Sequence, residues 1–302
     1  MNEKELIKII KTTLNSEYIG DDCAYLKDLG IVISQDSLVE DVHFKLALIT
    51  PFQLGYKSVM VNISDICASG AKPTYLTIAL SLPKYVDEKF VEEFYKGAKE
   101  AAQDVKIVGG DLTGSDKIFI SVTAIGATLN RKISSRANAQ NGYKVIVSGE
   151  HGNSATGLKL LLQSDFGKNL SKCEKEKFIN SHLMPVAQRE FSKSIATQIH
   201  ENYAMMDTSD GLADALIQIA KASGVTVKID TTKIPHDKIV NMQTVLYGGE
   251  DYQLVAAVPK EFLSQITNYT VIGEIFNGDI GIMLDNQFYS EIDNKLFNHF
   301  KE

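Results

Sequence analysis

Residues 50–73 read TPFQLGYKSVMVNISDICASGAKP, and this stretch decides how the rest of the chain is interpreted. Thr50 can cap a helix, Pro51 suits the first helical position, and Gly70 with Pro73 behind it forms a stop. The stretch therefore predicts a single helix of about five turns, most of whose circumference is apolar or small.

One polar line runs along this predicted helix. Ser58, Asn62, Asp65 and Ser69 lie at offsets of 0, 4, 7 and 11, which a period of 3.6 residues stacks on one face. An unpaired anion surrounded by core costs several kcal/mol. We expect Asp65 to be neutralised by a cation, by hydrogen bonds from the polar line, or by both. For Asp65 alone, a position on a solvated face of the helix would be the ordinary interpretation. The acidic motifs elsewhere in the chain favour a binding site instead.

Composition sets outer bounds on the class of protein. The 302 residues suffice for two domains of ordinary size or one large one, and the polar, basic stretch at 130–142 marks the expected boundary. A net charge of −7 without basic runs argues against nucleic-acid binding. The 3 cysteines have no paired spacing, which favours a reducing, cytoplasmic location. No apolar run approaches the roughly 18 residues of a membrane span.

Further acidic residues follow glycines or strand ends along the chain. A strand predicted at 31–38 ends in an acidic patch, and two glycines precede an Asp in a predicted strand-end loop ahead of a strand at 117–129. Two aspartates, at 207 and 210, lie where a helix predicted at 212–222 begins. A second pair of glycines followed by acidic residues, at 248–251, precedes a strand predicted at 253–258. The residues concerned are Asp21, Asp22, Asp36, Glu40, Asp41, Asp111, Asp207, Asp210, Glu250 and Asp251.

These motifs together suggest a site for several cations shared by both halves of the chain. Ligand sets made of oxygen, without paired His or Cys, favour magnesium or manganese over zinc. Magnesium held by a few carboxylates, with phosphate oxygens and water in the other positions, is the usual arrangement around a nucleotide.

Seven motifs, in order and over nearly the full chain, carry a resemblance to a known family. They are GDDCA at 20–24, DxLVExVHF at 36–44, VNISDICASGAKP at 61–73, GGDLTG at 109–114, SGxxGxSAxGL at 148–158, DTSDGL at 207–212 and GGEDY at 248–252. The ordered set resembles the thiamine-monophosphate kinases. Their superfamily also holds aminoimidazole ribonucleotide synthetase, selenophosphate synthetase and a hydrogenase-maturation dehydratase.

The resemblance implies a role for individual residues. It implies that Gly110, Asp111, Arg136 and Ser209 lie near ATP, and that His43, Glu250 and Phe297 lie near the thiamine phosphate. The magnesium ligands that it implies are Asp22, Ser34, Asp36, Asp65, Asp111, Asp207 and Asp210.

The implied fold has two α/β (α+β) domains, at residues 1–135 and 136–302, each a mixed sheet with flanking helices. The amino-terminal sheets are expected to pair in a homodimer.

The implied activity is direct transfer of the ATP γ-phosphoryl group to the phosphate of thiamine monophosphate, assisted by several Mg²⁺ ions. A phosphate monoester is already ionised near neutral pH, so no general base is expected. Two alternatives stay open: another ATP-dependent enzyme of the superfamily, such as an aminoimidazole ribonucleotide synthetase, and a nucleotide-binding regulator without turnover. Selenophosphate synthetase is disfavoured because only a helix, without a reactive cysteine, precedes Gly20.

Overall fold

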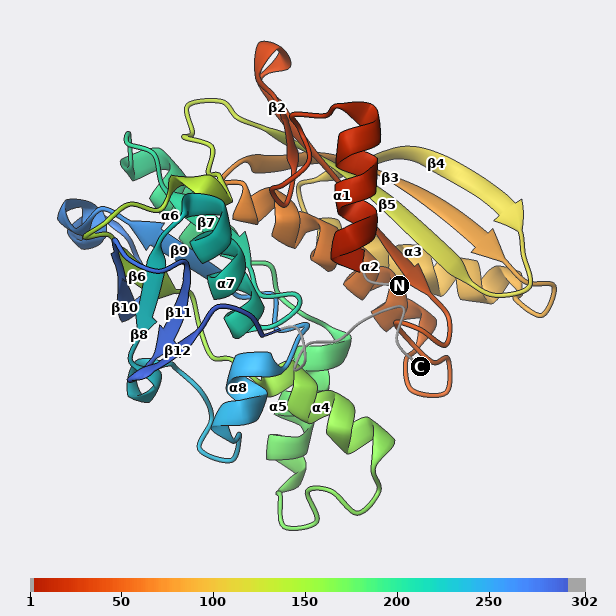
Figure 1. The fold of residues 1–302 in the computed structure, drawn as a ribbon. Coiled ribbons are helices and arrows are strands. Elements are labelled where there is room, and N and C mark those ends of the chain that lie inside the picture. The colour runs from red at the N-terminus through yellow and green to blue at the C-terminus, as the bar shows by residue number, and fades with distance from the viewer. Residues whose placement is uncertain (1–2, 293–302) are drawn as a thin grey trace.

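Two β-sheets organise the chain in the computed structural model, which describes residues 3–292 (Figure 1). Both sheets are mixed and both are flanked by helices, as the sequence predicts. The first sheet is built entirely from residues before 128, and the second entirely from residues after 143. Phe297 falls outside the described residues.

The first sheet has the strand order β1-β2-β5-β3-β4, in which only β3 and β4 run parallel. Helix α2 packs on β2, β3 and β5, and α3 packs against α2. Helix α1 precedes the sheet. The bounds are α1 Glu3–Leu14, β1 Ala24–Leu26, β2 Ile31–Val39, α2 Pro51–Ala68, β3 Lys72–Leu82, α3 Glu88–Ala102, β4 Lys106–Gly114 and β5 Phe119–Ala127.

The second sheet has the order β12-β11-β8-β10-β6-β9-β7, with β8 and β11 parallel. Its strands are β6 Lys144–Val147, β7 Ala204–Asp207, β8 Thr226–Ile229, β9 Leu254–Val258, β10 Thr270–Phe276, β11 Gly281–Leu284 and β12 Gln287–Tyr289. The accompanying helices are α4 Asn153–Leu162, α5 Lys172–Leu183, α6 Arg189–Gln198, α7 Leu212–Ser223 and α8 Met242–Tyr247. A short 3-10 segment, Arg136–Asn138, lies between the sheets in sequence.

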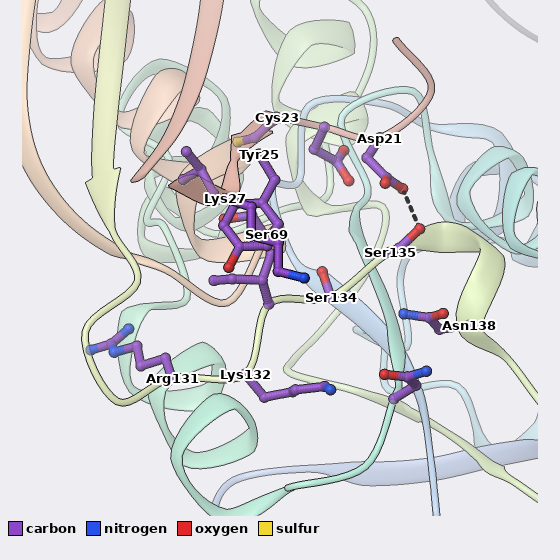
Figure 2. Close-up of a pocket in the computed structure, with 14 residues that line it drawn as sticks. Asp21, Cys23, Tyr25, Lys27, Ser69, Arg131, Lys132, Ser134, Ser135 and Asn138 are labelled. Carbon is purple, nitrogen blue, oxygen red and sulfur yellow. Dashed lines mark hydrogen bonds between the residues drawn. The ribbon is translucent and has the colours of Figure 1, made fainter. Parts of the chain in front are cut away.

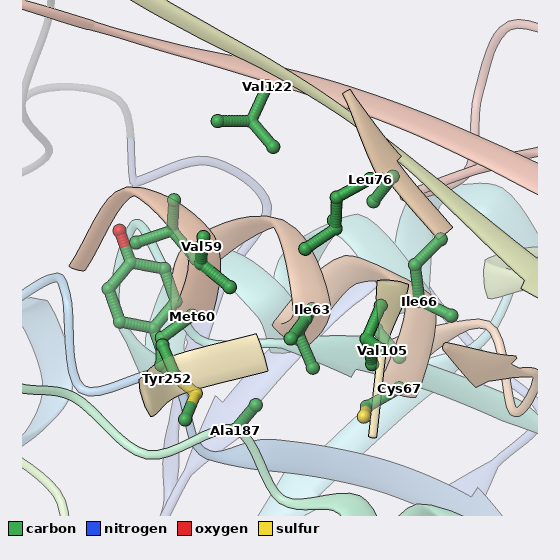
Figure 3. Packing of buried hydrophobic residues seen from close by; sticks show 14 of the residues in the cluster. Val59, Met60, Ile63, Ile66, Cys67, Leu76, Val105, Val122, Ala187 and Tyr252 are labelled. Atoms are coloured by element: carbon green, nitrogen blue, oxygen red, sulfur yellow. The ribbon is translucent and has the colours of Figure 1, made fainter. Parts of the chain in front are cut away.

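Helix α2 is the predicted central helix, and it begins and ends where the sequence indicates. The Thr50 hydroxyl accepts from the Gln53 N–H in a capping box, and Gly70 has a φ of +84° behind the last turn. Figure 3 shows α2 with Leu76 and Val122 of the first sheet on one side and with Tyr252 of the second half on the other. Burial on both sides explains why nearly its whole surface is apolar.

Two glycines let α2 and α3 approach each other closely. A Cβ on Gly55 would lie 1.9 Å from the Phe94 carbonyl oxygen, and one on Gly97 would lie 1.8 Å from that of Phe52. Each glycine therefore faces the backbone of the opposite helix. This contact fixes α2 on its outer side and leaves its other face for the carboxy-terminal half of the chain.

One prediction about local structure is wrong, and one helix was not predicted. Gly109, Gly110 and Asp111 were expected in a strand-end loop, but they lie within β4, because Gly110 lets that strand come close to the backbone of Ile78. The polar stretch at 164–181 contains most of a helix that the sequence does not predict, because its second half belongs to α5. Ser171 and Glu174 start α5 with a capping box, which outweighs the low hydrophobicity of the stretch.

Among the described residues, none of the helices has both the length and the apolar character needed to cross a bilayer.

Candidate active site

Three aspartates from distant parts of the sequence meet at the junction of the two halves. Asp22 precedes β1, Asp65 lies in the last turns of α2, and Asp207 ends β7. One carboxylate oxygen from each lies within 4.8 Å of the other two. We call these three residues the acidic cluster. The structure thus brings together three of the seven predicted metal ligands, and they come from both halves of the chain.

Hydroxyl groups orient two of these carboxylates. Ser34 in β2 donates to Asp65, so a fourth predicted ligand touches the acidic cluster directly. One oxygen of Asp207 accepts from the Ser64 hydroxyl at 2.7 Å, and the other accepts from the Ser209 hydroxyl at 2.8 Å. Oxygen ligands held by hydrogen bonds in this way are pre-organised for a hard cation.

The polar line on α2 supports the cluster without neutralising it. The Asn62 side chain donates to the Ser58 carbonyl and accepts from the backbone N–H of Asp36, while Ser69 donates to the Ile66 carbonyl. Within the described residues, the hydrogen bond to the Asp65 carboxylate comes from Ser34 and not from the polar line. The expectation that hydrogen bonds from the polar line neutralise Asp65 is therefore not met.

Burial and mutual repulsion raise the pKa of each carboxyl group in the acidic cluster. Burial raises the pKa of Asp22 to about 6, against the pull of Arg136 and with repulsion from Asp207 adding to it. Burial also raises the pKa of Asp65 well above its ordinary value, and Asp36 and Asp207 raise it further. The pKa of Asp207 is raised by burial too, although Ser64 and Ser209 oppose this. Like charges packed this closely call for a cation among them.

Asp36 borders the acidic cluster on the β2 side. Its backbone is tied to Asn62 of α2, and its pKa is raised by burial and by Asp22. Asp210 is exposed and lies outside the three-carboxylate group.

Asp111 is farther away, because the strand register places it on the other side of the first sheet. It pairs with Ala79 and through it with Ser121, whereas Asp36 pairs with Val122 on the buried side. Within one chain, Asp111 and Asp36 therefore lie on opposite faces of the sheet.

Arg136 closes one side of the cluster. Its guanidinium Nη2 lies 2.9 Å from Asp22, and its backbone N–H donates to Asp21 at 2.7 Å. The Arg136 Nε is buried and has no hydrogen-bond partner among the described residues. An arginine with an unused donor beside a carboxylate group suits a phosphate, which accepts from both edges of a guanidinium.

A second group of charged side chains surrounds Glu250. Its Oε1 lies 2.9 Å from Lys57 Nζ and its Oε2 lies 3.3 Å from His182 Nδ1. Burial alone would raise the pKa of Glu250, but Lys57 and His182, with a smaller effect from His43, bring it below its ordinary value. The carboxylate stays ionised, and 30% of the side chain is exposed.

His43 has a defined tautomer. Its Nδ1 accepts a hydrogen bond from the backbone N–H of Val39 at 3.0 Å, so in the neutral ring the proton is on Nε2. His43 can therefore act as a hydrogen-bond donor, which suits contact with an anionic substrate.

A cavity of about 370 Å³ adjoins the acidic cluster, and Figure 2 shows its lining. Asp22 lines both the cavity and the cluster. Lys27 and Lys132 also line it, and a hydrogen bond of 3.3 Å between Ser135 and Asp21 crosses one end. The basic groups place positive potential beside the carboxylates.

Sequence reasoning missed three side chains that shape the site: Lys57, Ser64 and His182. Lys57 is only 1% exposed, and a lysine inside an otherwise apolar helix was the available signal. Ser64 directly precedes Asp65, and a single small side chain off the polar line gave no indication of a role in the site. His182 lies near the end of α5, a helix that the sequence does not predict, so no periodicity pointed to it.

Comparisons with known proteins agree with this geometry. Residues 20–128 match the family model described as "AIR synthase related protein, N-terminal domain". The thiamine-monophosphate kinase of Aquifex aeolicus is 36% identical over 99% of this chain and 98% of its own, and that of Bacillus subtilis is 34% identical over 94% and 93%.

The fold superposes on the structure of AaThiL complexed with AMPPCP and TMP. The TM-score is 0.89 with 34% identity, and the match covers 99% of this chain and 97% of the other. Sequence, fold and the acidic cluster lead to one conclusion: the chain belongs to the thiamine-monophosphate kinase family.

Proposed function

We propose that this protein transfers the γ-phosphoryl group of ATP to thiamine monophosphate, giving thiamine diphosphate and ADP. The acidic cluster carries the proposal, because it draws Asp22 and Asp65 from one half of the chain and Asp207 from the other. Two phosphorylated substrates repel each other strongly, and a site for dications at the junction of two halves is suited to hold both.

The donor set fits Mg²⁺. All of the groups are oxygens and the carboxylates are close, and burial with mutual repulsion raises the pKa of Asp65 and Asp207 despite the hydrogen bonds that they accept from serine hydroxyls. The residues that would hold the ions are Asp22, Ser34, Asp36, Asp65 and Asp207, with Asp111 and Asp210 as further candidates. When bound, the ions neutralise phosphate charge, which lowers the barrier to transfer.

The chain's own residues bind and orient the reactants. Arg136 and Ser209 flank the acidic cluster and are assigned to the phosphates of ATP, with Gly110 and Asp111. His43 is assigned to thiamine monophosphate as a donor through Nε2, and Glu250 with Phe297 is assigned to its thiamine part.

The chemical step needs no protein nucleophile. A phosphate oxygen of thiamine monophosphate attacks the γ-phosphorus, the new P–O bond forms, and the bond from that phosphorus to the bridging oxygen of ATP breaks to release ADP. The acceptor is ionised at neutral pH, since its second pKa is about 6. The protein's contribution is alignment of the two phosphates and compensation of charge.

We also propose a homodimer formed through the first sheet. Strand β4 is an edge strand, nearly all of it exposed, and Val108 and Leu112 are 57% and 67% exposed. Tyr75 and Phe119, from β3 and β5, are exposed as well. A long exposed edge with apolar side chains favours pairing with another sheet. A second copy of the chain would bring its own Asp111 to this surface. The domain boundary at 135/136 and a cytoplasmic location complete the proposal.

The test is a product assay. The purified protein is incubated with ATP, MgCl₂ and thiamine monophosphate, and the thiamine phosphates are separated by chromatography. Thiamine diphosphate and ADP in equal amounts are expected. Nucleotide binding without thiamine diphosphate would instead support a regulator. Turnover of an aminoimidazole ribonucleotide precursor alone would assign the chain to a different activity of the superfamily.

A further inference from the structure

Helix α2 holds the second half of the chain at two points on one of its faces. Lys57 Nζ lies 2.9 Å from Glu250 Oε1, and the Ser64 hydroxyl lies 2.7 Å from Asp207. Residues seven apart on a helix project within about 20° of each other and are separated by about 10 Å along the axis. One face of α2 therefore contacts both the last residue of β7 and the loop before β9.

The contact with Glu250 is built to fix that carboxylate. Glu250 has a φ of +66°, a conformation that a side-chain-bearing residue adopts only when its surroundings impose it. Its backbone N–H donates to the Ser209 carbonyl at 2.6 Å, directly beside the acidic cluster. Lys57 lies behind it, 1% exposed, while 30% of the Glu250 side chain remains open.

His182 secures the other oxygen of Glu250. Its Nδ1 lies 3.3 Å from Glu250 Oε2 and 3.1 Å from the Ser154 hydroxyl. Burial lowers the pKa of His182 to about 4, with the Lys57 charge lowering it further, so the ring is neutral at pH 7. The positive charge that fixes Glu250 at neutral pH is therefore the buried ammonium of Lys57.

A fixed, partly open carboxylate is suited to a cationic ligand, and the thiazolium ring of thiamine carries a permanent positive charge. We propose that Lys57 is a positioning residue that directs Glu250 at this ring, and that α2, through Lys57 and Ser64, sets the separation between the ring-binding carboxylate and the acidic cluster. This inference rests on the proposed function.

The two contacts on α2 predict different kinetic effects. Lys57→Met keeps an unbranched side chain one atom shorter than lysine and removes the charge. It is expected to raise the KM for thiamine monophosphate at least tenfold, with less than a twofold change in the KM for ATP. Ser64→Ala is expected to raise the Mg²⁺ concentration needed for half-maximal rate and to leave the KM for thiamine monophosphate within twofold. Lys99→Met, at an exposed position on α3, controls for the substitution itself.

A double-mutant cycle separates positioning from general support of the fold. If Lys57 acts through Glu250, adding Lys57→Met to Glu250→Gln changes the KM for thiamine monophosphate no further. An equal effect of Lys57→Met in both backgrounds would overturn the inference, as would equal losses of affinity for both substrates. Should Lys57→Met alone fail to fold, the double variant removes both charges of the ion pair together, and its comparison with Glu250→Gln still decides. Absence of turnover in the wild type would instead overturn the proposed function.

Discussion

Replacing Asp65 by Asn should have two opposite effects: a gain in the stability of the metal-free protein and a loss of Mg²⁺ binding and turnover. The change keeps the side-chain volume and an acceptor for Ser34 but removes the central charge. At separations of at most 4.8 Å, each repulsive pair costs about 3.5 kcal/mol or more at an effective dielectric constant of about 20. Protonation in the metal-free protein limits this cost, so we expect Asp65→Asn to stabilise that protein by about 1–2 kcal/mol. The variant should also lose Mg²⁺ binding and turnover, the latter by about a thousandfold.

The assay is thermal unfolding in EDTA and across a Mg²⁺ titration, followed by measurement of thiamine diphosphate formation. Wild type should gain stability as Mg²⁺ is added, and Asp65→Asn should start higher and gain little. Asp28→Asn makes the same charge change at an exposed position and should behave as wild type. A variant that is still stabilised by Mg²⁺ and keeps near-normal turnover would refute the assignment of Asp65 as a ligand.

Four further predictions follow from individual contacts. Asp111→Asn and Asp65→Asn should each be inactive alone. A mixture of the two that exchanges subunits should recover activity, because one copy then supplies Asp65 and the other supplies Asp111. No recovery at any mixing ratio would contradict a site shared between two copies. Gly97→Ala should lower the free energy of unfolding by about 1–3 kcal/mol, because its Cβ would lie 1.8 Å from the Phe52 carbonyl oxygen, and urea titration showing no loss would contradict this packing. Burial lowers the pKa of His151 from 6.5 to about 4, so between these pH values the unfolded chain binds more protons than the folded one. The free energy of unfolding of the wild type should therefore fall by about 2–3 kcal/mol as pH falls through this window, whereas that of His151→Leu should not. Parallel curves of stability against pH for the two proteins, from urea titrations, would contradict this. Phe297→Ala should mainly raise the KM for thiamine monophosphate, and a selective loss of ATP affinity would contradict its assignment.

Much of the fold could be predicted because local signals agree with tertiary packing. The cap at Thr50, the stop at Gly70 and the uniform apolar surface of α2 all indicate one buried helix, and the structure has it at residues 51–68. The differences from the structure arise where one signal stood alone or was weak. Gly109 and Gly110 indicated a loop, but in an edge strand a glycine also permits close backbone approach. Hydrophobicity gave no indication of α5, whose start depends on the capping pair Ser171 and Glu174.

The site was predictable in its residue types and less so in its geometry. A buried carboxylate on α2 implied partners, and Asp22 and Asp207 are indeed beside Asp65. Sequence alone does not reveal strand parity across a sheet, so the placement of Asp36 and Asp111 on opposite faces could not be foreseen. Lys57 was missed because a charged residue within a core helix becomes meaningful only when its partner, 193 positions away in sequence at Glu250, is known.

The most direct test of the metal site is a crystal structure of the protein with AMPPCP, thiamine monophosphate and Mn²⁺, analysed by anomalous scattering. The account predicts manganese peaks about 2 Å from carboxylate oxygens of Asp22, Asp65 and Asp207, bridging to the phosphates of both ligands. Manganese found only elsewhere, with the triphosphate remote from these three aspartates, would contradict it.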